Sequence, residues 1–490
     1  MTQSSKPHSS VIESHSIDYI PLSERRGKVW HLWPIWFSGD ATVATLAIGT
    51  LSLSMGASLA WTLVAILTGC AFGTLFMAFH STQGPQLGLP QMIQSRPQFG
   101  YMGALLVWVI ALINYIGSNS LCQLFVDQTV HEFTGTSSKP YVVIFTILAI
   151  LVAIFGYRWI HKVQRIISYI MIAVLAVFTV FVCCFHIFPT GSFSLSHFKT
   201  VAFLTEFFVA AAYQLSWAIY VSDYSRYLPP NVGVSSSFWW TYMGALIGGV
   251  WMMAVGALAA ALFPKADIAE ALLHTGNFLF PGFGAIVLIA SFLGLITITG
   301  LNFYGGSLTL LSMIDSFKPF RPKTASRIIT IIGIGIVCTF FAFDMTGNFT
   351  NDMGDFLTII LYLFTPWTAI NLIDFYFVRH THYSVREIFN PHGIYGRWSW
   401  RGLLAYGLGF VAMIPFFNAG FFIGPIAHAL GGADISMIIG LIVSSGVYLL
   451  ACRSLDLKAE FAAAKKADIG LDQVTDALSS EKPNLTTANI

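Results

Sequence analysis

Charged side chains are scarce in this chain. Asp, Glu, Lys and Arg make up 10% of its 490 residues, whereas hydrophobic residues make up 56%. Because soluble domains carry about 25% charged residues, this composition excludes an ordinary soluble domain. The net charge of +2 gives no indication of a nucleic-acid partner, and nothing in the composition indicates an obligate protein partner.

Motifs for catalysis and for cofactor binding are missing as well. The chain has no Gly-rich phosphate loop, no HExxH pair and no nucleophile elbow. Its six cysteines show no metal-type spacing and lie in apolar segments, where we interpret them as small packing residues. The thirteen histidines are scattered, mostly in loops. We therefore predict neither an enzyme nor a bound cofactor.

Long apolar runs are abundant. A run of about 20 apolar residues can span a bilayer as a helix. We count twelve such runs, at residues 33–58, 59–80, 101–126, 140–156, 166–188, 201–221, 237–263, 282–312, 328–344, 356–378, 402–424 and 435–452. The predicted fold class is an all-α polytopic membrane protein. Its transporter domain would cover residues 29–452 between polar tails at 1–28 and 453–490, and no cleavable signal peptide is expected before it.

The placement of basic residues supports this topology. With the N-terminus in the cytoplasm and alternating loops, 22 of the 25 Lys and Arg residues fall on the inner side. The outer loops hold only Lys139, Lys199 and Lys265. Such a bias follows the positive-inside rule. We therefore expect a multi-pass protein of the cell membrane, as in a bacterial inner membrane, with both termini in the cytoplasm.

Asp40 is an acidic residue inside the first apolar run, directly after Gly39. A carboxylate within a membrane helix is costly and usually marks a site for a cation or a proton. A neighbouring glycine can open the helix, and the exposed carbonyls could bind an alkali cation. The alternative is a protonated Asp40, or an Asp40 at a wet helix end.

Polar and aromatic side chains share one face on each of three predicted helices. The residues are Tyr115, Ser118, Asn119 and Cys122 in the third helix, Glu206, Tyr213, Gln214, Trp217 and Tyr220 in the sixth, and Thr297, Thr299, Asn302, Tyr304 and Ser307 in the eighth. Aromatic faces can stack on a planar ring, and amides can hydrogen-bond its edge. Any one of these faces could serve helix packing alone, but the three together favour a binding site.

Three loop motifs identify a family. Gln86-Leu87-Gly88-Leu89-Pro90-Gln91-Met92-Ile93-Gln94-Ser95-Arg96-Pro97-Gln98-Phe99-Gly100 follows the second helix, Ser222-Asp223-Tyr224-Ser225-Arg226-Tyr227-Leu228-Pro229 ends the sixth, and Asp374-Phe375-Tyr376-Phe377-Val378-Arg379 ends the tenth. These motifs resemble the signature loops of the nucleobase:cation symporter-1 family, and the second resembles its purine–cytosine permease branch. The resemblance covers roughly residues 17–450.

The resemblance implies a leucine-transporter-like fold. Two inverted five-helix repeats would lie at about residues 29–188 and 201–378, followed by two extra helices at about 402–452. Helices one and six would be interrupted in mid-membrane, and the substrate would lie between helices one, three, six and eight.

The resemblance also implies roles for substrate-binding residues. Tyr213 or Trp217 would stack on the substrate, and the nearest aromatic residue in helix three is Tyr115. Asn119 and Asn302 would supply amides. From its residue type, Gln214 could read a ring edge, and Ser118 lies on the same predicted face as Asn119.

The resemblance further implies that a coupling cation would take main-chain carbonyls near Gly39 and Val43 and hydroxyls of Thr297 and Thr299. Asp40 stands where many relatives carry a neutral amide, which indicates either a stronger sodium site or proton coupling. Glu206 is a second buried acid candidate.

The predicted function is cation-coupled import of a nucleobase or a related planar heterocycle of the cytosine and purine class, by alternating access. The coupling ion is sodium or a proton. A symporter of allantoin or hydantoin, of a thiamine-precursor pyrimidine or of an amino acid on the same scaffold is the nearest alternative. A membrane enzyme is disfavoured because no metal or nucleophile cluster is present. A membrane receptor is disfavoured because it would rarely need two intramembrane acids and broken helices.

Overall fold

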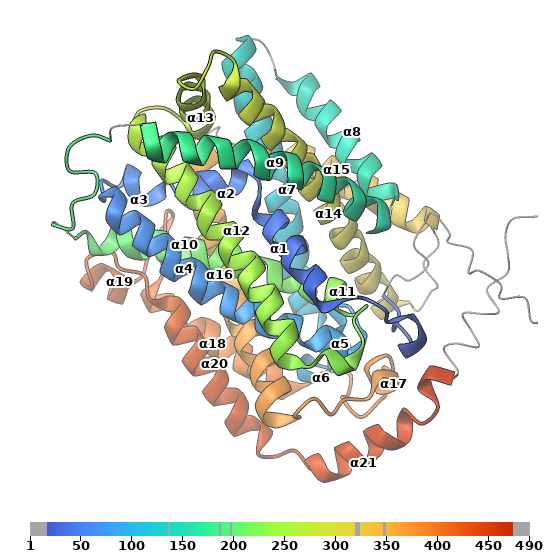
Figure 1. Cartoon of the computed structure of the whole chain (residues 1–490). Coiled ribbons are helices and arrows are strands. Elements are labelled where there is room, and N and C mark those ends of the chain that lie inside the picture. Colours follow the sequence, from blue (N-terminus) through green and yellow to red (C-terminus); the bar gives the residue numbers. More distant parts are fainter. Residues whose placement is uncertain are drawn as a thin grey trace, which may run out of the picture.

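The computed structural model describes residues 17–135, 138–155, 157–185, 188–196, 198–318, 324–345 and 349–473. The predicted polar tails therefore lie partly outside the described residues. Helices dominate the described chain, and Figure 1 shows the longer ones running roughly side by side. This arrangement agrees with the predicted all-α class.

Helices lie at each of the twelve predicted spans. Their bounds are Leu32–Asp40, Val43–Ile48 and Leu51–Ser54 (α1, α2, α3), Leu59–Ser81 (α4), Leu105–Thr134 (α7), Lys139–Phe155 (α8), Tyr157–Phe185 (α9), Thr200–Ser216 (α10), Val234–Leu262 (α12), Phe283–Phe317 (α14), Thr324–Asp344 (α15), Phe349–Ile373 (α16), Trp400–Met413 (α18) and Ser436–Cys452 (α20). Among the described residues, seven helices are by themselves long and apolar enough to cross a membrane. The count of twelve spans stays a prediction.

The first span is broken in its middle. Helix α1 ends at Asp40, and Ala41 and Thr42 take non-helical backbone angles before α2 begins at Val43. The Thr42 amide donates to the Asp40 carbonyl at 2.8 Å, which closes a tight turn in place of a helical hydrogen bond. The predicted interruption of this helix is therefore present, directly after the acidic residue.

The sixth span is broken as well. Helix α10 ends at Ser216, a 3₁₀ turn covers Trp217–Ile219, and the short helix α11 covers Val221–Ser225. Tyr220, between the turn and α11, has φ −137° and ψ 8°. The two broken spans are five spans apart, as expected for the first helices of two five-helix repeats.

A bundle forms from the broken spans together with α4 and α12. A side chain on Gly73 would overlap the Ala211 backbone of α10, and one on Gly256 would overlap the Leu46 backbone of α2. Glycine therefore permits backbone-to-backbone contact at both places, which is a common packing device of membrane helices. Figure 1 shows α1, α4, α10 and α12 together on one side of the molecule.

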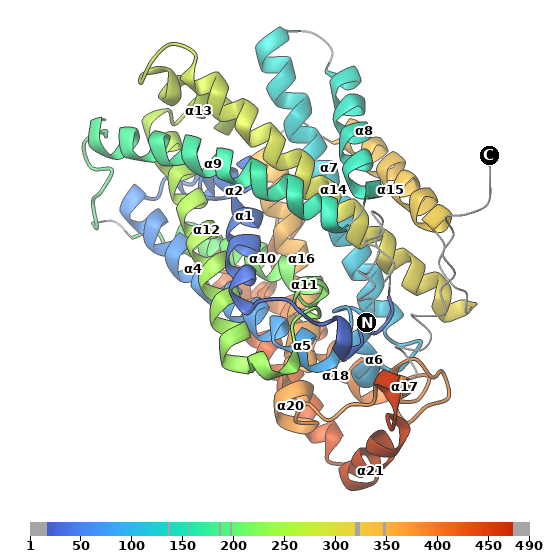
Figure 2. The same ribbon diagram turned by 45° about the vertical axis from the view of Figure 1, so that its right-hand side comes forward.

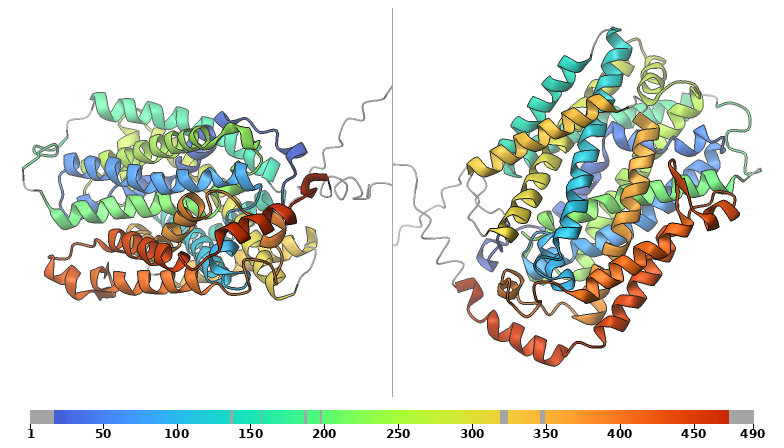
Figure 3. Two further views of the ribbon diagram at one scale, coloured as in Figure 1. Left: turned by 90° about the horizontal axis from the view of Figure 1, so that it is seen from below. Right: turned by 180° about the vertical axis from the view of Figure 1, so that it is seen from behind.

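The remaining helices pack against this bundle. Figure 2 shows α7, α8, α14 and α15 as a neighbouring group, and α16 passes between that group and the bundle. Helices α18 and α20 form an outer layer in Figure 3. The predicted eleventh span, 402–424, ends early: Pro415 lies in a 3₁₀ turn at Ile414–Phe416, and a small hairpin of Asn418–Ala419 (β1) and Phe422–Ile423 (β2) follows.

The two ends of the molecule differ in character. One end carries the N-terminal segment 17–31, together with Gln83–Leu87 (α5), Arg96–Phe99 (α6), Val385–Ile388 (α17) and Leu457–Ala467 (α21). We call it the basic end, because Arg25, Arg96, Arg226 and Arg379 are buried there. The opposite end carries α3 and the helix α13, Ile268–Asn277, and we call it the vestibule end.

Candidate functional site

A cavity of about 40 Å³ lies beside the break of the first span. It is enclosed by the first span, α7, the sixth span, α14 and α16. Its lining residues are Thr42, Ala44, Asn114, Ser118, Cys122, Tyr213, Ser216, Trp217, Tyr220, Ile298, Asn302, Met353 and Leu357. The cavity thus lies between the helices that the sequence predicted, and α16 contributes in addition.

Three aromatic residues of the sixth span form one wall. The Trp217 ring centroid lies 5.7 Å from that of Tyr213 and 5.8 Å from that of Tyr220, both in edge-on arrangements. A methyl group at Gly39 would lie 3.1 Å from Cζ3 of Trp217, so the missing side chain lets the indole pack on α1. The Tyr213 hydroxyl and Thr45 Oγ1 are 2.6 Å apart, which fixes the position of this phenol.

Helix α7 presents a different edge from the predicted one. Asn114, Ser118 and Cys122, at i, i+4 and i+8, line the cavity. Tyr115 instead stacks on Tyr220 with centroids 5.7 Å apart. Asn119 is fully buried away from the cavity. The structure therefore brings Ser118 to the cavity and leaves Tyr115 and Asn119 outside its lining.

Helix α14 divides its polar residues among several neighbours. Asn302 and Ile298 line the cavity. Thr297 donates to the carbonyl of Gly294 at 2.8 Å, whereas buried Thr299 has no hydrogen-bond partner among the described residues and lies near the Cys122 thiol. Asn302 thus lines the cavity, and Thr299 faces α7 rather than the break.

The break itself lies against α14. A methyl group at Gly294 would be 3.2 Å from the Ala41 carbonyl oxygen, so this carbonyl meets the helix one turn before Thr297. Val43, the first residue of α2, is fully buried. The Ala41 carbonyl therefore meets α14 one turn from Thr297, and the cation site at this place stays a prediction.

The Asp40 side chain points elsewhere. Its Oδ2 accepts from Gln214 Nε2 at 3.3 Å, and a methyl group at Gly248 of α12 would lie 3.1 Å from its Cβ. Its Oδ1 has no partner among the described residues. Asp40 and Gln214 thus pair with each other inside the bundle. Gln214 does not line the cavity, so its predicted contact with a ring edge is absent from this arrangement.

Glu206 is also inside the bundle. Its Oε2 accepts from the Ser52 amide of α3 at 2.9 Å. Ser52 Oγ in turn lies 2.8 Å from Thr62 Oγ1 of α4. The glutamate therefore joins the vestibule-end halves of the two broken spans and does not line the cavity.

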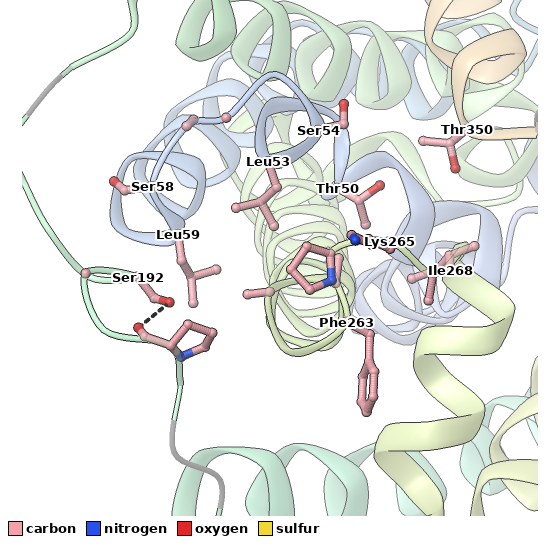
Figure 4. A pocket seen from close by; sticks show the side chains of 18 of the residues that line it. Thr50, Leu53, Ser54, Ser58, Leu59, Ser192, Phe263, Lys265, Ile268 and Thr350 are labelled. Atoms are coloured by element: carbon pink, nitrogen blue, oxygen red, sulfur yellow. Dashed lines mark hydrogen bonds between the residues drawn. The ribbon is translucent and has the colours of Figure 1, made fainter.

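A much larger hollow opens at the vestibule end. It has a volume of about 860 Å³, and Figure 4 shows Thr50, Leu53, Ser54, Phe263, Lys265 and Ile268 among the residues around it. The first turn of α16 lines this vestibule with Thr350, and the next turn lines the cavity. Toward the basic end, a separate space between α11 and α14 has a volume of only about 10 Å³.

Sequence reasoning missed five lining residues with hydrogen-bonding or flexible side chains: Thr42, Asn114, Ser216, Met353 and Leu357. Asn114 is four residues before Ser118, and this helical spacing could have revealed it. Its Oδ1 is buried without a partner among the described residues, and so is Nε1 of Trp217. A buried acceptor and a buried donor left open beside a cavity are groups that a ligand could satisfy.

The two broken spans around a central cavity define a membrane protein of the leucine-transporter-like fold. Residues 19–440 match the family model described as permease for cytosine/purines, uracil, thiamine, allantoin, and the chain belongs to that family. The predicted family is thereby confirmed, and the protein is a transporter rather than an enzyme.

Individual relatives agree with this assignment. The chain is 37% identical over 439 residues to YxlA of Bacillus subtilis (strain 168), provisionally named a purine-cytosine permease, covering 89% of this chain and 95% of YxlA. It is 24% identical over 465 residues to the purine-cytosine permease fcyB of Emericella nidulans, covering 89% and 88% of the two chains. Mhp1, a nucleobase-cation-symport-1 family transporter solved with bromovinylhydantoin bound, aligns with a TM-score of 0.73 at 16% identity over 95% of this chain and 100% of Mhp1.

Proposed function

We propose that this transporter imports a neutral, planar nitrogenous base of the cytosine and purine class. The observation that carries the proposal is the pairing of an aromatic wall with open hydrogen-bonding groups around one cavity. Trp217 offers a flat face for stacking, and Asn114 Oδ1 is a buried acceptor without a partner among the described residues. Asn302 adds a second amide from α14. Both named relatives carry the name purine–cytosine permease, YxlA provisionally, which supports this substrate class.

The proposed binding mode is one-sided stacking. Its aromatic wall comes entirely from the sixth span, whereas α7 offers Asn114, Ser118 and Cys122. A base would therefore lie against Trp217 while amides of α7 and α14 hydrogen-bond its edges.

The proposed coupling ion binds at or near the break of the first span. Carbonyls of the break, such as that of Ala41, and the Thr297 hydroxyl suit an alkali cation, which prefers oxygen ligands. Gly39 lies one residue before Asp40 and contacts Trp217, and Val43 begins α2. An ion here would stabilise the turn on which Trp217 packs, and this links ion binding to substrate binding. Asp40 would act from within the bundle. Either its negative charge would attract the cation to this site, or its carboxylate would take up the coupling proton.

The proposed orientation follows the positive-inside rule. The basic end would face the cytoplasm, with both chain termini on that side. The vestibule, with Lys199 and Lys265, would face outward. In this orientation the vestibule is the entrance, and the narrow space between α11 and α14 is the exit to be opened in the next step of alternating access.

Removing an amide from the cavity should weaken substrate binding. We expect Asn114→Ala and Asn302→Ala each to cost about 1–3 kcal/mol, because a polar edge of the base would lose its partner in a dry site. Equilibrium binding of a radiolabelled base to purified protein measures this. Asn119→Ala is the matched control, since it makes the same chemical change on α7 outside the cavity lining. Equal losses in all three variants would remove Asn114 and Asn302 from the proposed site.

Cys122 allows a test of the proposed function in the native sequence. It lines the cavity, so a bound base should shield its thiol. We expect cytosine or a purine to slow alkylation of Cys122 by N-ethylmaleimide about tenfold at saturation, in a background where exposed Cys183 and Cys184 are serine. Amino acids should give no protection. Protection by an amino acid and by no base would overturn the proposed substrate class.

A further inference from the structure

The C-terminal segment 457–473 lies across the basic end of the molecule. Figure 2 shows α21 next to α17 there. The Arg379 side chain is buried and pairs with Glu460 of α21 at 2.5 Å and also with Asp374 at the end of α16. Because a buried charge that loses its partner is costly, this pair anchors the start of α21 to the end of α16.

A second anchor holds the end of α21. Asp468 accepts from Ser384 Oγ at 2.7 Å and from the Val385 amide at 2.8 Å, at the start of α17. Arg386 Nη1 returns a hydrogen bond to the Ala467 carbonyl at 2.8 Å. Three hydrogen bonds therefore join the end of α21 to the start of α17, and the two helices form one unit.

This unit is tied to the wall that faces α11 across the exit. Arg96 Nη1 donates to the Ile388 carbonyl at the end of α17, at 3.2 Å. Its Nη2 donates to Ser316 Oγ near the end of α14, at 3.1 Å. Helix α14 contributes Leu301, Tyr304 and Leu308 to the narrow space toward the basic end. The C-terminal segment is therefore coupled to α14.

The opposite wall of the exit is tied to the N-terminal segment. Arg226 Nη1, at the end of α11, donates to the Asp18 carbonyl at 3.3 Å. The Gly27 amide donates to the Tyr227 carbonyl at 3.1 Å. The same segment leads directly into α1. Residues 17–31 are therefore attached to the bundle and would move with it.

Asp472 joins the two sides. Its Oδ1 accepts from the Tyr19 hydroxyl at 2.9 Å and from the Leu22 amide at 3.1 Å. Burial, opposed in part by Arg25, raises the pKa of Tyr19, and the hydrogen bond to Asp472 raises it further. The phenol therefore stays protonated and remains a donor at physiological pH.

We propose that residues 457–473 are a strap that keeps the exit between α11 and α14 closed, and that Asp472 is its release point. Opening the exit separates α11 and the N-terminal segment from α14 and the unit of α17 and α21. The bonds of Asp472 cross this division and are lost on opening. The Gln91 amide donates to Asp223 of α11 at 2.8 Å and is a second contact that favours the closed exit. The strap therefore raises the fraction of molecules whose exit is closed and does not block opening.

The test uses Cys122 as a reporter of access from the basic end. Inside-out and right-side-out membrane vesicles without substrate are treated with a membrane-impermeant maleimide, with Cys183 and Cys184 replaced by serine. We expect Asp472→Ala to raise the labelling rate from the basic-end side about threefold to tenfold, and Tyr19→Phe about twofold to fivefold, because each loses hydrogen bonds present only in the closed state. Labelling from the vestibule side should fall or stay constant.

Asp267→Ala is the matched control. Asp267 caps α13 at the vestibule end through the Glu270 amide at 2.9 Å, at the opposite end of the molecule from the strap, so its loss should leave the labelling rate from the basic-end side unchanged. Cys122→Ser identifies signal from the remaining cysteines. Unchanged labelling in both Asp472→Ala and Tyr19→Phe, with normal thermal stability, would overturn the strap. The assay contains no substrate, so its outcome is independent of which solute is carried, and labelling from both sides makes it independent of the proposed orientation.

Discussion

Replacing Trp217 with leucine should weaken binding of the transported base about tenfold to a hundredfold. Stacking of a base on an aromatic side chain contributes about 1–3 kcal/mol, and leucine removes the flat face while keeping an apolar side chain. Trp217→Phe should retain much of the affinity, because a smaller ring still stacks. Equilibrium binding and initial uptake rates measured in the same preparations would show both effects.

Trp36→Leu is the control for this prediction. Trp36 is buried in the same aromatic cluster, with its ring centroid 6.1 Å from that of Trp217, but it does not line the cavity. Trp36→Leu should lower thermal stability about as much as Trp217→Leu does, but it should weaken binding of the base less. If Trp217→Leu binds the base like the wild type while folded, the aromatic wall is a packing feature and the base lies elsewhere.

Asp40→Asn should separate transport from its driving force. Asparagine has nearly the same shape and can still bond with Gln214, but it carries neither a charge nor a titratable proton. One coupled charge moving through about 100 mV supplies about 2.3 kcal/mol, which corresponds to roughly fiftyfold accumulation. If Asp40 carries the coupling proton, we expect the variant to reach about equal concentrations on the two sides while it still exchanges one base for another.

Ion dependence distinguishes the two forms of coupling. If Asp40 strengthens a sodium site, the variant should need more sodium and recover uptake at high sodium. If Asp40 takes up a proton, no sodium concentration should restore accumulation. Wild-type accumulation at every pH and sodium concentration would instead make Asp40 a structural residue of the bundle.

The sequence located the spans and the break of the first helix because both depend on local properties. Apolar runs must match the bilayer thickness, and a carboxylate beside a glycine within such a run is an unusual local signal. The break occurs directly after Asp40. The early end of the eleventh span at Pro415 was also visible in the sequence, since proline disrupts a helix interior, but the apolar residues beyond it extended the prediction.

The direction of individual side chains was harder to predict. On α7, successive residues are about 100° apart, so Tyr115 and Asn119 lie next to the edge that faces the cavity. Tyr115 fits against Gly305 of α14, a contact between distant segments that no local pattern reveals. Asp40 and Gln214 are 174 positions apart, and their pairing turns both away from the cavity. Such pairings depend on how helices rotate against each other during packing.

Accumulation of labelled solutes in proteoliposomes is the most direct test of import of a planar base driven by a cation gradient. Purified protein would be given cytosine, adenine, hypoxanthine, uracil, allantoin or an amino acid, each with an imposed sodium gradient, an imposed proton gradient or neither. We predict that at least one cytosine- or purine-class base accumulates above equilibrium with one of the two gradients and only equilibrates without them. Accumulation of an amino acid or allantoin with no base transported, or equal base uptake with and without gradients, would contradict the proposed function.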